Sequence, residues 1–122
     1  NIIFESDYKP KNLSSFIKKF KSAQFGINYD TGNSASLNYD IDNEFLKYGS
    51  YIRNIHIKDR ERFGKTVRLG KGNANFKKLF QNLKKINYNG NLIMQTARSA
   101  NDNHLKELMI NLKYIKQIQN EI

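Results

Sequence analysis

Two stretches of the sequence, residues 25–33 (FGINYDTGN) and residues 51–59 (YIRNIHIKD), decide the fold. Each is a strand-like apolar run that gives way to a polar loop, and each places a potential metal ligand at that point: Asp30 in the first and His56 in the second. In a parallel α/β architecture the carboxyl ends of the strands form one face, where ligands bind. The two side chains are therefore expected to share one site.

Strand-like and helix-like segments alternate along the rest of the chain. Short apolar runs bounded by Gly, Pro or Asn predict strands, and apolar residues at helical spacing predict amphipathic helices. The predicted strands cover residues 1–4, 25–29, 51–57 and 91–96, and the predicted helices cover residues 13–20, 41–48, 76–86 and 104–118. Four βα units in succession imply a parallel sheet with right-handed crossovers. The pattern predicts one α/β domain over residues 1–122, either a small open sheet or half of an eight-fold (β/α) barrel.

The amino-acid composition limits which metal ligands, nucleophiles and partners the chain can have. The chain has no cysteine, which excludes disulfides, thiolate zinc sites and thiol nucleophiles, leaves oxygen and imidazole as metal ligands, and makes the cytoplasm the default location. No apolar run approaches the roughly 18 residues of a membrane span, so no membrane partner is expected. The net charge is +10, but the lysines are spread over the polar faces of separate predicted helices. A nucleic-acid partner is therefore not expected.

A polar side chain follows each predicted strand. These residues are Glu5, Asp30, His56 and Gln95, one for each βα unit. Because each unit returns its strand to the same side of the sheet, all four are expected at one face. Considered alone, Asp30 is also typical of a residue that stabilises a turn, and His56 is also typical of a histidine that is buried in the core. Their joint placement at successive strand ends is what favours a site.

At this point the chain resembles the sugar phosphate isomerase/epimerase family, the xylose-isomerase-like TIM barrels. The resemblance covers essentially the whole chain, as strands five to eight of that barrel, and it implies that an upstream half is absent. The matching pieces are residues 4–7 (FESD), 30–33 (DTGN), 56–59 (HIKD) and 69–73 (LGKGN).

The resemblance implies one divalent metal ion bound by Glu5, Asp30, His56 and Gln95. Oxygen ligands with one imidazole suit manganese, magnesium, cobalt or zinc. In such enzymes the ion binds adjacent sugar oxygens and stabilises an enediolate, while a nearby carboxylate moves the proton. The implied activity is that of a sugar or sugar phosphate isomerase or epimerase, with Glu5 as the base.

The last strand departs from the family pattern. Many members carry a second glutamate there, and epimerases need two proton-transferring groups on opposite faces of the substrate carbon. Gln95 cannot transfer a proton, although its amide oxygen can ligate a cation. One-base isomerisation is therefore favoured over epimerisation, unless Asp59 or a residue of the upstream half supplies the second base.

Other residues are candidates for substrate contacts. Gly70 and Gly72 precede the helix predicted from about residue 76, where backbone N–H groups can bind a phosphate. Arg62 and Arg98 follow the last two strands and are expected to reach the same anion or the sugar hydroxyls. The resemblance also assigns a substrate contact to Asn33. Simple turn chemistry remains an alternative reading of the two glycines.

Two other classes of function stay open. The same barrel underlies endonuclease IV, a metal-dependent DNA phosphodiesterase, but a three-metal site needs more histidines than the two in this chain. The chain also fits a non-catalytic binding or assembly module. Half a barrel leaves its outer strands as open edges, which predicts pairing with another copy or with the absent half.

Overall fold

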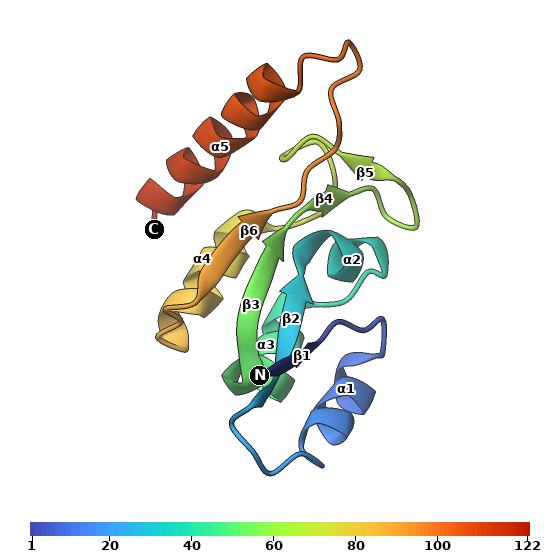
Figure 1. The fold of residues 1–122 in the computed structure, drawn as a ribbon, viewed down its shortest axis with the longest axis vertical. Helices are drawn as coiled ribbons and strands as arrows, with labels where there is room; N and C mark the ends of the chain where they lie inside the picture. Colours follow the sequence, from blue (N-terminus) through green and yellow to red (C-terminus); the bar gives the residue numbers. More distant parts are fainter.

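A four-stranded parallel sheet organises the molecule (Figure 1). The computed structural model describes all of residues 1–122. The strand order is β1-β2-β3-β6, and every neighbouring pair is parallel. The strands are β1 (Ile2–Phe4), β2 (Phe25–Asp30), β3 (Ile52–Ile57) and β6 (Asn91–Met94). The predicted succession of four βα units is therefore confirmed, with the sheet open at both edges.

Helices follow each strand of this sheet. They are α1 (Pro10–Ile17), α2 (Thr31–Ser36), α3 (Ile41–Tyr48), α4 (Phe76–Lys85) and α5 (His104–Asn120), with a 3-10 turn at Gly49–Tyr51. In Figure 1, α3 and α4 lie behind the sheet, on the face where the core residues of β2 and β3 are buried. No helix is both long enough and apolar enough to cross a membrane.

Three local elements differ from the sequence prediction. Helix α1 begins at Pro10, because proline suits the first helical turn, and ends at Ile17. Helix α2 was not expected; it begins where the Asp30 side chain accepts a hydrogen bond from the backbone N–H of Asn33, at 2.8 Å. The predicted long loop contains an antiparallel pair of short strands, β4 (Asp59–Arg60) and β5 (Thr66–Val67).

The two faces of the sheet differ. The face toward α3 and α4 carries Ile27, Ile55 and Ile57, all fully buried. The opposite face is open, and its apolar residues at the two edges, Ile3 and Ile93, are 42% and 46% exposed. Parallel sheets are normally covered on both faces, so this face has the character of a half-barrel interior.

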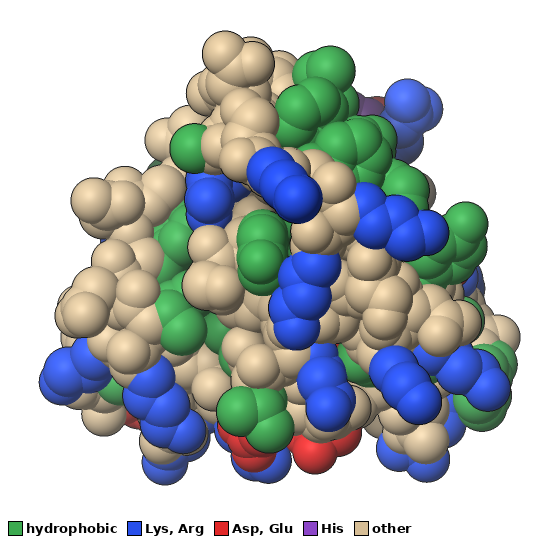
Figure 2. All heavy atoms as spheres, turned by 90° about the horizontal axis from the view of Figure 1, so that it is seen from below, with side chains coloured by type: hydrophobic (Ala, Val, Ile, Leu, Met, Phe, Trp, Pro, Cys, Tyr) green, Lys and Arg blue, Asp and Glu red, His purple; other side chains and the backbone are tan.

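Basic side chains are scattered over one end of the molecule. Figure 2 views the molecule from the end where the strands begin, and it shows lysine and arginine side chains spread singly among apolar and neutral groups. One helical lysine, Lys78, pairs with the carboxylate of Asp42 at 2.6 Å. The basic residues on this face form no continuous stripe.

A buried carboxylate anchors the helices behind β2. Glu44 of α3 accepts hydrogen bonds from the hydroxyls of Tyr29 at 2.8 Å, Ser34 at 2.7 Å and Tyr48 at 2.9 Å. Burial raises the pKa of Glu44, although the three hydroxyl donors act in the opposite direction. The cluster joins β2, the α2 segment and α3 directly behind the carboxyl end of the sheet.

This raised pKa predicts a pH-dependent stability. A carboxyl whose pKa is higher in the folded state contributes stability that is fully present below its ordinary value of 4.5 and is lost as the pH rises through the folded value. We expect the unfolding free energy of the wild type, minus that of Glu44→Gln, to fall over this pH range. Urea unfolding of both proteins at several pH values measures the difference; two parallel profiles would contradict the assignment.

Candidate metal centre

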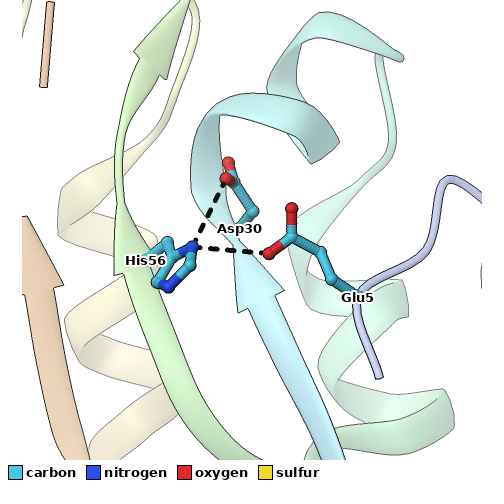
Figure 3. Close-up of side chains that lie close together, drawn as sticks. All are labelled: Glu5, Asp30 and His56. Atoms are coloured by element: carbon cyan, nitrogen blue, oxygen red, sulfur yellow. Dashed lines mark ion pairs between the residues drawn. The ribbon is translucent and has the colours of Figure 1, made fainter. Parts of the chain in front are cut away.

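Glu5, Asp30 and His56 lie together at the carboxyl ends of three adjacent strands (Figure 3). Glu5 follows β1, Asp30 ends β2, and His56 is the direct partner of Asp30 in the ladder between β2 and β3. Partners in a parallel ladder project from the same face of the sheet. All three side chains therefore meet on the open face.

An irregularity in the ladder produces this alignment. Ile27 pairs with Ile52, but the next pair is Asn28 with Asn54, so one residue of β3 is skipped. Without this shift Asp30 would lie opposite Ile55, whose side chain is fully buried in the core. A bulge of this kind re-aims the residues that follow it. Here it places Asp30 and His56 on one face.

The three side chains present one ligand atom each to a common point. The Nδ1 atom of His56 lies 3.4 Å from Oε2 of Glu5 and 3.9 Å from Oδ2 of Asp30. The three ligand atoms lie within 4.8 Å of one another. In the neutral tautomer with the proton on Nε2, the Nδ1 lone pair faces both carboxylates. This geometry matches the spacing of ligands around one ion.

The surroundings of the Asp30 carboxylate show whether the site suits a cation. Its side chain is 2% exposed, its Oδ1 caps α2, and its Oδ2 is buried without a hydrogen-bond partner. A buried carboxylate oxygen is costly unless a charge or a donor satisfies it. Two carboxylates and an imidazole suit Mn²⁺, Mg²⁺, Co²⁺ or Zn²⁺. The residues present therefore fit a divalent ion.

Asn28 supports two of the three ligands. Its Nδ2 donates a hydrogen bond to Glu5 Oε2 and lies 3.1 Å from His56 Nδ1. Its Oδ1 accepts a hydrogen bond from Asn54 Nδ2 at 2.7 Å. Asn28 was not among the residues predicted from the sequence. The signal was present, because Asn28 stands two positions before Asp30 on one strand and so shares its face.

A second polar chain holds the other oxygen of Glu5. Asn33 Nδ2 donates to Glu5 Oε1 at 3.2 Å, and Asn33 Oδ1 accepts from Arg60 Nη1 at 3.0 Å. The carbonyl of Gly64 fixes Arg60 through Nε and Nη2. Asn33, expected to contact substrate, is thus already engaged with Glu5. Arg60 was not anticipated, since its position depends on the β4–β5 hairpin.

Gln95 does not join the three ligands in the structure. It follows β6, and its Oε1 accepts a hydrogen bond from Lys58 Nζ at 3.2 Å. The same Nζ lies 3.6 Å from Asp30 Oδ2. The expected fourth ligand is therefore paired with a lysine that stands beside Asp30. Lys58 was not among the residues predicted from the sequence.

The glycine turn binds a carboxylate of the protein itself. The backbone N–H groups of Gly70 and Gly72 both donate to Asp59 Oδ2 at 2.9 Å, and that of Ala74 donates to Asp59 Oδ1 at 2.9 Å. A Cβ at Gly72 would lie 2.3 Å from Asp59 Oδ1, so the close approach requires glycine. The expected phosphate cradle is thus filled by Asp59. The same burial removes Asp59 as a second base.

The two remaining candidates, Arg62 and Arg98, are exposed in the loops after β4 and β6. Neither side chain makes a hydrogen bond or ion pair; only the backbone N–H of Arg62 is engaged, with Asn73 Oδ1 at 2.7 Å. The structure does not bring them to the three ligands. Their expected substrate contacts remain predictions.

Comparison with known proteins identifies the family of this chain. A family model described as xylose isomerase-like TIM barrel matches residues 4–118. The chain therefore belongs to the xylose isomerase-like TIM barrel family.

Individual relatives are longer than this chain. An uncharacterized protein of Methanocaldococcus jannaschii, MJ1311, is 27% identical over 92% of this chain and 38% of its own length. A xylose isomerase domain protein from Planctomyces limnophilus superposes with a TM-score of 0.80 at 24% identity, over 97% of this chain and 46% of its own. A D-tagatose 3-epimerase-like protein gives a TM-score of 0.66 at 26% identity, over 93% and 42%. This chain thus spans less than half of each.

The Asp59 contacts predict a stability effect. Asp59→Asn replaces one acceptor oxygen by an amide that faces backbone donors, and we expect it to lower the unfolding free energy by about 2–4 kcal/mol. Glu61→Gln, an exposed neighbour, is the control and should change it by less than about 0.5 kcal/mol. Urea unfolding measures both. Equal stability of the two variants would show that Asp59 does not organise the loop.

Proposed function

We propose that the chain carries the metal-binding half of a sugar or sugar phosphate isomerase/epimerase. The convergence of Glu5, Asp30 and His56 at the carboxyl ends of parallel strands, around an Asp30 Oδ2 that is buried and receives no hydrogen bond, carries this proposal. The D-tagatose 3-epimerase-like neighbour and the family support the sugar chemistry. The whole activity extends beyond this chain, since the relatives are more than twice as long.

Glu5 has two oxygens with different surroundings, and this suggests two roles. Oε2 faces His56 and Asn28, on the side of the ion, whereas Oε1 contacts the Asn33 amide. When bound, a divalent ion supplies the positive charge that stabilises the oxygen of a substrate losing a neighbouring C–H proton. Glu5 is partly exposed and accepts that proton on Oε1, then returns it to the adjacent carbon.

Asp59 and Asp30, the acids nearest the other strand ends, do not supply a second base. Asp59 is buried against three backbone N–H groups, and Asp30 is divided between the α2 cap and the ion site. The Gln95 side chain has no titratable group and so cannot act as a base. Within this chain, Glu5 therefore moves one proton between adjacent carbons of the substrate. Together with transfer of the hydroxyl proton from one of the two substrate oxygens to the other, this is aldose–ketose isomerisation. Since Asp59 fills the glycine turn, the residues present favour a free sugar over binding of a sugar phosphate through that turn.

A DNA phosphodiesterase activity is less well supported. The second histidine, His104, lies at the start of α5 and pairs with Asp102 at 3.6 Å, away from His56. The lysine and arginine side chains of Figure 2 lie on the face remote from the carboxyl ends of the strands. The two histidines do not share a site, and the candidate centre holds a single imidazole.

Metal binding tests the proposal. We expect the wild type, titrated with Mn²⁺ by isothermal calorimetry, to bind close to one equivalent, because three ligands converge on one point. Asp30→Ala combined with His56→Ala should abolish binding. A double variant of exposed residues, Glu121→Ala with His104→Ala, is the matched control and should bind like the wild type. Absence of Mn²⁺ binding by the wild type would overturn the proposed site.

Self-association is proposed as a second property of the half-barrel. The open edges at β1 and β6 carry the exposed residues Ile2, Ile3, Leu92 and Ile93. Unpaired strands with apolar side chains are templates for pairing, so a second copy of this chain is the proposed partner. The cytoplasmic location remains a prediction from composition.

Light scattering coupled to size exclusion tests this pairing. We expect a dimer or larger species in the wild type and a monomer in Ile3→Lys, Ile93→Lys, because lysine on an edge opposes pairing. Leu46→Lys, at a position of α3 that is 82% exposed, is the control and should leave the assembly unchanged. A monomeric wild type would contradict the proposal.

A further inference from the structure

Lys58 places a positive charge inside the proposed site. It lies two residues after His56, so its side chain turns to the same open face. The side chain is only 18% exposed, and Nζ lies between Asp30 Oδ2 at 3.6 Å and Gln95 Oε1 at 3.2 Å. This lysine therefore occupies the region where a fourth metal ligand was expected.

The residues after Asp30 hold Lys58 in this position. Thr31 Oγ1 accepts a hydrogen bond from the backbone N–H of Lys58 at 2.9 Å and donates to its carbonyl at 2.5 Å. The same hydroxyl lies 3.2 Å from the His56 carbonyl. The stem of Lys58 passes over Gly32, where an added Cβ would lie 2.7 Å from its Cγ. The Thr-Gly pair thus fixes the backbone of Lys58 and makes room for its side chain.

The charge of Lys58 is not fully neutralised within the site. Glu5 and Asp30 together balance a divalent ion, and Gln95 accepts the hydrogen bond of the ammonium without carrying charge. A glutamate at position 95 would cancel the extra positive charge. With glutamine there, ion and ammonium together leave an excess positive charge facing the open side of the sheet. Such a charge stabilises an oxygen that becomes negative during reaction.

We propose that the site holds its divalent ion with three protein ligands, and that the Lys58 ammonium, held by Gln95, is a second electrophile that binds a substrate oxygen beside the ion. The proposal rests on the proposed metal-dependent function. It assigns Gln95 to the positioning of Lys58. It also accounts for the Thr31–Gly32 pair, which binding of the ion does not require.

Two opposite effects follow from the position of the ammonium. It repels a cation bound at Asp30, because like charges a few ångströms apart interact strongly in a partly buried site. Removing it should strengthen metal binding by about tenfold or more. It attracts an anionic oxygen at the same place, so its removal should weaken binding of a small α-hydroxy acid by about tenfold.

The test uses Mn²⁺ and glycolate as probes. Calorimetry is carried out first with Mn²⁺ and then with glycolate on the Mn²⁺-loaded protein. In Lys58→Met we expect tighter Mn²⁺ binding and weaker glycolate binding than in the wild type. Lys58→Arg keeps the positive charge, so its affinities for Mn²⁺ and for glycolate should both be close to those of the wild type. Lys65→Met, in the exposed hairpin loop, should match the wild type.

Gln95→Ala separates the two roles of position 95. If Gln95 only positions Lys58, Mn²⁺ affinity should not fall; if it ligates the ion, the affinity should fall by about tenfold or more. Unchanged or weaker Mn²⁺ binding in Lys58→Met, with an unfolding midpoint like that of the wild type, would overturn the inference alone. No Mn²⁺ binding by any folded variant, the wild type included, would overturn the proposed function and this inference together.

Discussion

The register of β2 against β3 is the constraint on which the site depends. The skipped residue between the Ile27–Ile52 and Asn28–Asn54 pairs turns Asp30 toward His56 instead of toward the core position Ile55. Side chains alternate along a strand, so a shift of one residue exchanges the two faces. The core isoleucines remain behind the sheet and the polar residues remain on the open face. A single irregularity in the ladder thus allows the core to pack on one face of the sheet and the site to form on the other.

Buried carboxylates connect this sheet to its surroundings. Glu44 binds three hydroxyls behind β2, and Asp59 binds three backbone N–H groups of the loop after β3. Asp30 differs from both because one of its oxygens has no donor. Two of the three acids are therefore fully hydrogen-bonded within the protein, whereas Oδ2 of Asp30 receives no hydrogen bond and has the Lys58 ammonium 3.6 Å away. This contrast is the physical reason for placing the metal centre at Asp30.

The sequence was informative where the signal is local. Apolar runs and helical spacing located the four βα units, and polar residues at strand ends identified Glu5, Asp30 and His56 as neighbours. The roles of Lys58, Gln95 and Asp59 depend on contacts between residues distant in the chain, which no periodicity encodes. The glycine turn illustrates the difference: its residues suit binding of an anion, but the anion is an internal carboxylate. Helix α2 was missed because its six residues depend on the Asp30 cap rather than on an apolar face.

The central claim is that His56 binds a metal ion together with Glu5 and Asp30. Electron spin echo envelope modulation of the Mn²⁺-loaded protein tests it most directly, because a directly bound imidazole nitrogen modulates the Mn²⁺ echo. We expect coupling to a single imidazole nitrogen in the wild type and its loss in His56→Ala. Nitrogen coupling that persists in His56→Ala, or a wild-type signal with no nitrogen coupling, would contradict it.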